Sequence, residues 1–221
     1  MSEIKCPLCC KTSVELFLST SQKISGKVHQ RQYWSCPVCF LVFLSPNQRL
    51  SQYEEKLRYE LHNNDLQQNA YRAHLNKLWQ PLKKKLQTGA VGLDYGSGPQ
   101  PALAMLVAEA GWEMATWDPF FSTDTKVFAK NYDFICCMEV IEHCFFPGRE
   151  LTKMISVLKD EAYLAIGTSQ LIDDNAFLTW RYRMDPTHVC FWRPQTVTWV
   201  AQHWQFEIVY QTDKVVIFHK N

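Results

Sequence analysis

The stretch Val91-Gly92-Leu93-Asp94-Tyr95-Gly96-Ser97-Gly98-Pro99-Gln100-Pro101 decides the fold, because it joins an apolar segment to a helix through a glycine-containing turn. A buried strand is predicted over residues 90–95, and the helix begins near Pro101. Gly96 and Gly98 allow the backbone to approach a ligand closely, and the helix N-terminus behind them adds a favourable dipole. This turn is typical of α/β proteins that bind nucleotides.

The chain after Gly89 alternates buried strands with amphipathic helices, which indicates a parallel sheet covered on both faces. The link between the last two predicted strands is only three residues long, so those two strands must pair antiparallel. Strands are predicted over 112–117, 132–138, 162–168, 206–211 and 215–219. Helices are predicted after 101, across a stripe of Leu151, Met154, Ile155 and Leu158, and over 194–204.

A second acid, Asp118, ends the second predicted strand, where a carboxylate can accept hydrogen bonds from both hydroxyls of a ribose. Asp94 precedes the glycine turn and fits a cationic group, such as the amino group of S-adenosylmethionine. A dinucleotide would place a pyrophosphate at this turn and would gain more from a third glycine. Gln100 or Pro101 occupies that region instead, which disfavours pyrophosphate.

These features resemble the class I S-adenosylmethionine-dependent methyltransferases, in particular bacterial members with an N-terminal zinc ribbon. Asp94-Tyr95-Gly96-Ser97-Gly98 matches their first motif, and Asp118 matches the acid after their second strand. Cys137-Met138-Glu139-Val140-Ile141-Glu142-His143 is similar to the segment after their fourth strand. The resemblance covers residues 89–221 and implies a Rossmann-like, seven-stranded sheet whose last strand is antiparallel. It implies S-adenosylmethionine as cofactor, bound by Asp94, Gly96, Gly98, Asp118 and Met138.

The sequence departs from this family pattern in two places. Gln100 stands where many relatives have glycine. Only 13 residues separate Asp118 from Tyr132, so the third strand and the loop that usually holds adenine are expected to be short.

Four N-terminal cysteines form two Cys-Pro-x-Cys pairs with 26 residues between them. Two such pairs can present four thiolates to one Zn²⁺ in a closed structural site. So short a segment buries little apolar surface, and metal binding would supply much of its folding free energy. A redox pair and a metal-free remnant are the alternatives, and Cys10 is interpreted as a spectator. The predicted ligands are Cys6, Cys9, Cys36 and Cys39.

Three regions are predicted: a zinc-ribbon module over 1–48, a helical connecting layer over 49–87 and a methyltransferase domain over 88–221. The connecting layer has apolar residues at helical spacing. By resemblance, such a layer folds over the cofactor and can pair with its carboxylate. Arg72 is the predicted partner.

Two histidines are candidate catalytic residues. His143 follows the predicted central strand, where it can act as a base or orient the acceptor; alternatively, it holds the local turn through hydrogen bonds. His188 lies in the aromatic and polar segment 180–192, a candidate substrate loop or a self-packed lid.

Composition narrows the function further. The net charge of +1 argues against a broad nucleic-acid surface, no apolar run approaches a membrane span, and nine cysteines with two tight pairs favour a reducing, cytoplasmic location. A small-molecule acceptor is therefore favoured. The alternatives are an RNA methyltransferase that docks through its zinc ribbon, a nicotinamide-dependent oxidoreductase, and a non-catalytic zinc-ribbon adaptor.

Overall fold

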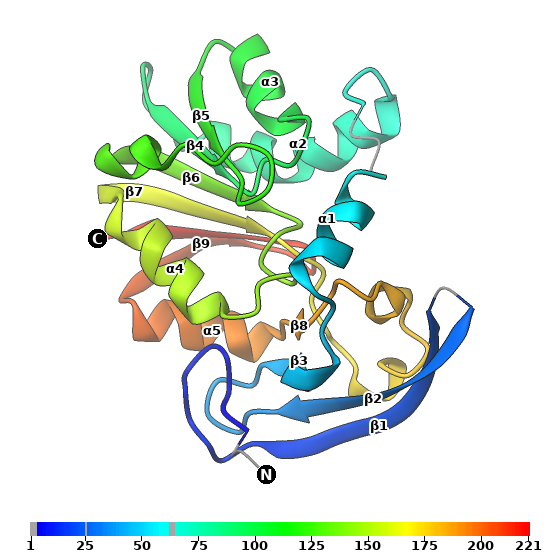
Figure 1. Cartoon of the computed structure of the whole chain (residues 1–221). Coiled ribbons are helices and arrows are strands. Elements are labelled where there is room, and N and C mark those ends of the chain that lie inside the picture. The colour runs from blue at the N-terminus through cyan, green and yellow to red at the C-terminus, as the bar shows by residue number, and fades with distance from the viewer. Residues whose placement is uncertain (1–3, 25, 62–64) are drawn as a thin grey trace.

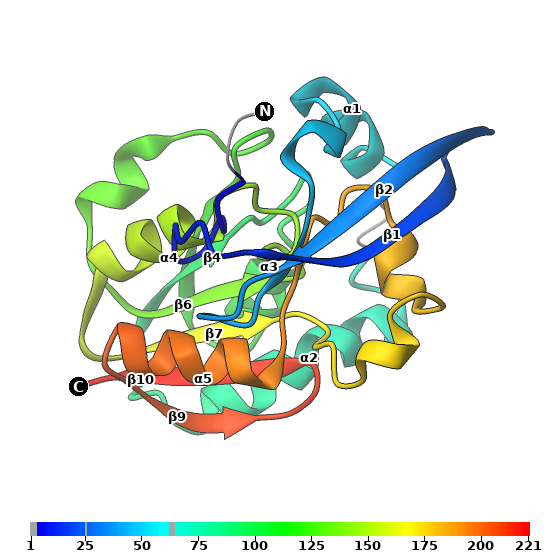
Figure 2. The ribbon, with the colours of Figure 1, turned by 90° about the horizontal axis from the view of Figure 1, so that it is seen from below.

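The computed structural model describes residues 4–24, 26–61 and 65–221, which form two β-sheets with helices around the larger one (Figures 1 and 2). The larger sheet has the strand order β5-β4-β6-β7-β10-β9. Its first four strands are parallel, and β10 pairs antiparallel with both β7 and β9. The strands are β4 (Val91–Tyr95), β5 (Glu113–Trp117), β6 (Tyr132–Met138), β7 (Leu158–Gly167), β9 (Phe206–Gln211) and β10 (Val215–Lys220).

These strands confirm the α/β prediction and its antiparallel end. β6 and β9 have the predicted bounds. β7 begins at Leu158, which the sequence pattern placed on the preceding helix, because the chain leaves that helix at Val157.

The prediction of seven strands is wrong for this sheet, which has six in the part of the chain that the structure describes. The strand expected between β5 and β6 is replaced by the short 3-10 helix η2 (Thr125–Ala129). An additional parallel strand between β5 and β6 would need a crossover of about a dozen or more residues on each side of it, whereas only 13 residues separate Asp118 from Tyr132.

Both faces of the larger sheet are buried, and β6 shows the alternation clearly. Ile135 and Cys137 pack into one apolar cluster, whereas Phe134 and Cys136 belong to a second cluster on the other face. Helices α4 (Pro147–Ser156) and α5 (Pro194–His203) contribute to the first cluster. Helices α2 (Asn69–Lys83) and α3 (Ala102–Glu109) contribute to the second, and Figure 1 shows the two pairs on opposite sides.

The smaller sheet is antiparallel and has the order β1-β2-β3-β8. Its first three strands come from the N-terminal region, but β8 comes from the segment after the 3-10 helices η3 (Asp174–Ala176) and η4 (Arg181–Met184). The fourth strand of this sheet therefore comes from within the predicted methyltransferase domain, 88–221, and not from the predicted ribbon module. The strands are β1 (Glu15–Ile24), β2 (Lys27–Ser35), β3 (Val42–Leu44) and β8 (Cys190–Phe191).

The connecting layer contains α1 (Gln52–Tyr59) and α2, and the 3-10 helix η1 (Pro46–Gln48) lies just before it. A capping box starts α1, since the Ser51 side chain accepts from the Glu54 N–H while the Glu54 carboxylate accepts from the Ser51 N–H. No helix among the described residues combines the length and apolarity that crossing a membrane requires.

Candidate active site

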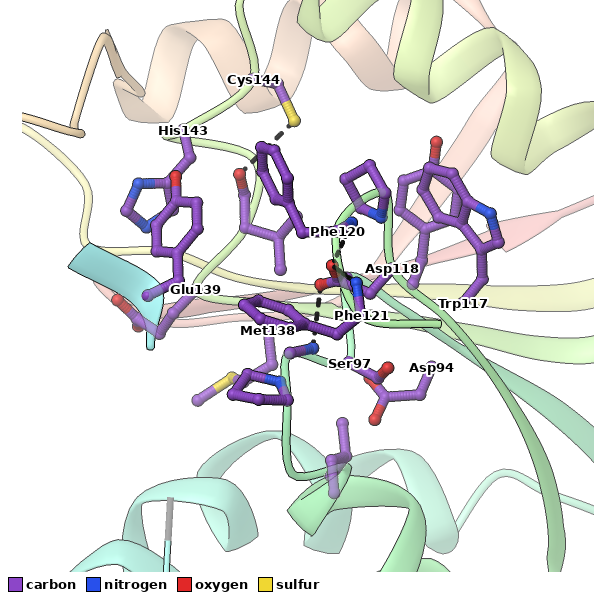
Figure 3. A pocket seen from close by; sticks show the side chains of 18 of the residues that line it. Asp94, Ser97, Trp117, Asp118, Phe120, Phe121, Met138, Glu139, His143 and Cys144 are labelled. Atoms are coloured by element: carbon purple, nitrogen blue, oxygen red, sulfur yellow. Dashed lines mark hydrogen bonds between the residues drawn. The ribbon is translucent and has the colours of Figure 1, made fainter. Parts of the chain in front are cut away.

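A cavity of about 700 Å³ lies at the carboxyl ends of β4, β5 and β6, with α1 and α2 over it. In open α/β sheets this edge is where ligands bind. Figure 3 shows Asp94, Ser97 and Asp118 around one part of the cavity and His143 with Cys144 at another. We call these parts the turn end and the histidine end.

The glycine turn approaches the cavity through backbone that only glycine accommodates readily. Gly96 and Gly98 have φ angles of +83° and +67°. A Cβ on Gly96 would lie 2.5 Å from Val140 Cγ2, so a side chain there would collide with the loop that follows β6. The N–H groups of Gly96 and Ser97 both donate to the Trp117 carbonyl, at 2.7 and 3.1 Å. The turn is thus held against the end of β5.

Asp118 joins this turn to the loop after β5. Its carboxylate accepts from the Gly98 N–H at 2.9 Å, the Phe120 N–H at 2.8 Å and the Phe121 N–H at 3.1 Å (Figure 3). A carboxylate offers about four acceptor positions, so Asp118 retains capacity for a ligand hydroxyl. The side chain is fixed before any ligand arrives.

Asp94 is a buried carboxyl group at the turn end. Desolvation raises the pKa of Asp94 to about 7; the Asp118 charge adds to this rise, and the Ala104 backbone N–H opposes it. A cationic ligand group would offset the cost of ionising a carboxyl group in this position.

Aromatic side chains that the sequence reasoning missed form part of the cavity wall. Trp117, Phe120 and Phe121 all line it, together with the predicted Met138. The run Trp117–Phe121, which places three aromatic residues close to Asp118 in the sequence, could have predicted this aromatic wall. These side chains provide an apolar surface of the kind that a nucleobase stacks on.

Arg72, the predicted partner of the cofactor carboxylate, is not among the residues that line the cavity. Its guanidinium makes two hydrogen bonds to the exposed Glu109 carboxylate, at 2.6 and 3.1 Å. The helix phase explains the difference, because Tyr71, His74 and Leu75 are the α2 residues that line the cavity. Arg72 lies about 100° around the helix from Tyr71 and faces α3 instead.

His143 and His188, far apart in sequence, meet at the histidine end. Their ring centroids are 4.6 Å apart in an edge-to-face arrangement, and both residues line the cavity. His143 Nδ1 is 3.2 Å from the Thr187 carbonyl oxygen, and His188 Nδ1 is 2.6 Å from the Tyr182 carbonyl oxygen. Carbonyl oxygens only accept, so Nδ1 is the donor in both contacts.

Behind the two histidines lies a buried acid. Tyr182 donates its hydroxyl hydrogen to Glu142, and the same hydroxyl oxygen is 3.0 Å from Thr168 Oγ1 and 3.2 Å from Glu139 Oε2. Glu142 is fully buried. Burial, with the Glu139 charge adding to it, raises the pKa of Glu142 well above its usual range.

The four predicted zinc ligands converge in the N-terminal region. The Sγ atoms of Cys6 and Cys39, and those of Cys9 and Cys36, are each 3.4 Å apart, and all four lie within 4.8 Å of one another. Disulfide sulfurs lie about 2.05 Å apart, so these are free thiols. A tetrahedral Zn²⁺ site would place its sulfurs about 3.8 Å apart, which this arrangement fits.

Both thiol pairs sit in the same type of turn. Cys10 N–H donates to the Cys6 carbonyl and Phe40 N–H to the Cys36 carbonyl, each at 2.9 Å. Cys10 and Phe40 also share a left-handed backbone, with φ of +61° and +62°. Cys10 is exposed and lies outside the cluster, in keeping with its interpretation as a spectator.

Comparison with known proteins identifies the family to which this chain belongs. Residues 62–211, more than half of the chain, match the model of the methyltransferase domain. The chain belongs to this methyltransferase family. A search of curated proteins gave no match to this methyltransferase.

Solved structures share the fold of this methyltransferase at low sequence identity. A Burkholderia thailandensis 1,6-didemethyltoxoflavin-N1-methyltransferase, solved with that compound and S-adenosylhomocysteine, is 12% identical, with a TM-score of 0.55 over 91% of this chain and 99% of the other. A SAM-dependent methyltransferase from Archaeoglobus fulgidus is 14% identical, with a TM-score of 0.51 over 67% and 94%. A magnesium protoporphyrin IX methyltransferase from Synechocystis, with bound S-adenosylhomocysteine, is 13% identical, with a TM-score of 0.50 over 77% and 95%.

Proposed function

We propose that this methyltransferase uses S-adenosylmethionine to methylate a small-molecule acceptor, and that its N-terminal region holds a structural zinc ion. One observation carries the proposal: a single cavity joins the Asp94–Gly98 turn and Asp118 to the histidine pair. The volume, about 700 Å³, falls in the range of small-molecule pockets. The structural neighbours crystallised with S-adenosylhomocysteine support the choice of cofactor.

The turn end would hold the cofactor. Asp94 would bind the amino group of its methionine portion, and Asp118 would accept from a ribose hydroxyl. Gly96 and Gly98 would let the backbone approach, and Met138 with the aromatic wall would contact the adenosyl portion. The buried Asp94 carboxyl fits this role, because an ammonium ion would stabilise its charged form.

The histidine end would hold the acceptor. S-adenosylmethionine supplies an activated methyl group, which moves to the acceptor by in-line displacement. Positioning accounts for most of the catalysis of such a step. His143 and His188 would orient the acceptor or take its proton, and the enclosing aromatic side chains Tyr59 and Phe145 would limit hydration.

The four thiolates would hold zinc in a closed site with no position for substrate. Its role would be structural, because the metal would stabilise the ribbon module, 1–48. The connecting layer, 49–87, would cover the cavity. The methyltransferase domain, 88–221, would supply the catalytic sheet.

Calorimetry with S-adenosylmethionine, S-adenosylhomocysteine and NAD tests the cofactor assignment. We expect the first two to bind and NAD not to bind. Asp118→Asn should weaken binding about tenfold to hundredfold, the range for a hydrogen bond to a charged group. Asp124→Asn, at the exposed cap of η2, is the matched control and should leave affinity unchanged.

Binding of NAD alone would contradict the proposal and favour an oxidoreductase. Binding of S-adenosylmethionine without labelled methyl transfer to any metabolite would favour a non-catalytic adaptor. RNA binding that weakens steeply with salt would favour an RNA methyltransferase.

A further inference from the structure

We propose that Glu142, His143 and His188 form a binding site for a divalent transition-metal ion at the histidine end of the cavity. Each of the three residues offers a ligand atom, and these atoms lie within 4.8 Å of one another. This site is separate from the four-cysteine cluster and differs from it in chemistry, because its ligands are two imidazoles and one carboxylate.

The carboxylate of Glu142 is prepared for a ligand. Its side chain is fully buried, and Tyr182 donates to Oε1. Within the described residues, Oε2 has no hydrogen-bond partner. Leaving a buried carboxylate oxygen unsatisfied costs free energy, and a bound cation would satisfy both its charge and its coordination.

The loop that carries His188 is tied to Glu142 through the backbone. The Glu142 carbonyl accepts from the Val189 N–H at 2.8 Å and from the Cys190 N–H at 2.9 Å. His143 follows Glu142 directly. The three residues are therefore held together by main-chain contacts that do not depend on an ion.

Each histidine is oriented by a contact typical of metal ligands. The Nδ1–H groups of His143 and His188 point at the carbonyl oxygens of Thr187 and Tyr182. In the neutral ring this places the lone pair on Nε2. An outer hydrogen bond of this kind sets the tautomer and ring orientation of ligating histidines in metalloproteins.

The ligand set indicates the class of ion. Imidazole and carboxylate together suit Mn²⁺, Fe²⁺, Co²⁺ or Zn²⁺ better than Mg²⁺ or Ca²⁺, which prefer ligands that are all oxygen. Three ligands from the part of the chain that the structure describes leave coordination positions open. Both histidines line the cavity while Glu142 lies behind them, so the open positions would face the acceptor.

This inference rests on the proposed function and narrows its acceptor to a compound with a hydroxyl oxygen that can bind the ion. The hydroxyl proton would be released to water as its pKa falls beside the cation. The oxygen–methyl bond would form as the methyl–sulfur bond breaks, and the neutral thioether would leave. The histidines would then position the acceptor through the ion rather than take its proton.

Titration with Mn²⁺, followed by electron paramagnetic resonance on zinc-loaded protein, tests the site in the absence of any substrate. Mn²⁺ is chosen because thiolate sites prefer zinc. We expect about one Mn²⁺ per chain, and at least about tenfold weaker binding in His143→Ala, in His188→Ala and in the isosteric Glu142→Gln, since even the loss of an outer partner has this effect. His29→Ala, on the exposed part of β2, is the matched control.

Absence of Mn²⁺ binding, or binding that survives all three substitutions, would overturn the site. Circular dichroism and the thermal unfolding midpoint of each variant show whether it remains folded, and calorimetry with S-adenosylmethionine tests the cofactor assignment separately. Mn²⁺ binding that is lost in the variants supports the site even if S-adenosylmethionine does not bind, in which case only the proposed function fails.

Discussion

The two ends of the cavity are built in different ways. At the turn end, Asp94, Gly96, Gly98 and Asp118 come from two neighbouring parallel strands and the turns that follow them. At the histidine end, His143 meets His188 only because distant parts of the chain pack together. The first arrangement is set by short-range backbone geometry, and the second depends on tertiary contacts.

The histidine end depends on the small antiparallel sheet. Leu44 N–H donates to the Val189 carbonyl at 2.8 Å, next to His188, and β3 pairs with β8 just beyond it. The N-terminal thiol cluster, whose Cys39 lies shortly before β3, is thus connected to the loop that carries His188. Loss of the proposed zinc ion should therefore affect the two ends unequally.

The largest effect is expected from Cys36→Ser, which removes one thiolate of the cluster. Methyl transfer, measured as label incorporated from S-adenosylmethionine into a metabolite extract, should fall by about 100-fold or more, because small displacements of positioning groups have effects of this size. Affinity for S-adenosylmethionine should stay within about threefold, since Asp118 is held by the N–H groups of Gly98, Phe120 and Phe121, none of which lies in the N-terminal sheet.

Cys10→Ser is the matched control, and it should retain zinc and activity because Cys10 lies outside the cluster. Unchanged zinc content in Cys36→Ser would remove Cys36 from the ligand set. Equal losses of turnover and cofactor affinity would show that the two ends are not separable.

Asp94→Asn should weaken S-adenosylmethionine binding about tenfold to hundredfold, the range for a charge-assisted hydrogen bond. The same substitution should stabilise the ligand-free protein above neutral pH, because the buried charge is removed. Calorimetry and denaturant unfolding at pH 8 measure the two effects. A loss of both affinity and stability would show that Asp94 is structural rather than a cofactor ligand.

The pH dependence of stability and of cofactor affinity should also be set by Asp94. Because the pKa of Asp94 is about 7 in the folded protein and 3.8 ordinarily, the folded state holds this proton more tightly than the unfolded state. Its contribution to stability should therefore decrease as pH rises from about 4 to 7. Cofactor affinity should rise over about pH 6 to 7 as Asp94 ionises. Asp94→Asn should flatten the pH dependence of both stability and cofactor affinity. If either pH dependence is unchanged in this variant, another group is responsible for it.

The smallest effect is expected from Arg72→Ala. Arg72 and Glu109 form an exposed ion pair, and such pairs contribute little to stability. Cofactor affinity and the unfolding midpoint should both match those of the unaltered protein. A clear loss of affinity would show that Arg72 contacts the cofactor, which its pairing with Glu109 on α3 does not predict.

Much of the fold follows from local patterns in the sequence. Short apolar runs predict β6 and β9, and the short link between the last two strands predicts the antiparallel edge, because each depends on neighbouring residues. The short connection after Asp118 partly predicts that the strand expected between β5 and β6 is missing. Family resemblance alone still gives seven strands, since it carries over a count that this connection cannot accommodate.

The site was only partly predictable. Asp94, Asp118 and Met138 line the cavity as the motifs indicate, because strand ends of a parallel sheet meet at one edge. The orientation of Arg72 depends on how α2 packs against α3. Glu142 Oε2, which has no hydrogen-bond partner among the described residues, owes this state to a depth of burial that no sequence spacing reveals.

Residue order was enough to establish the glycine turn, the buried strands and the two thiol pairs, because each is a short-range pattern governed by backbone sterics, alternation or chelate spacing. The tertiary structure alone decided that β8 completes the N-terminal sheet and that His188 reaches His143 and Glu142. These contacts join segments far apart in the chain. Their formation depends on the packing of the whole core, which a one-dimensional pattern does not contain.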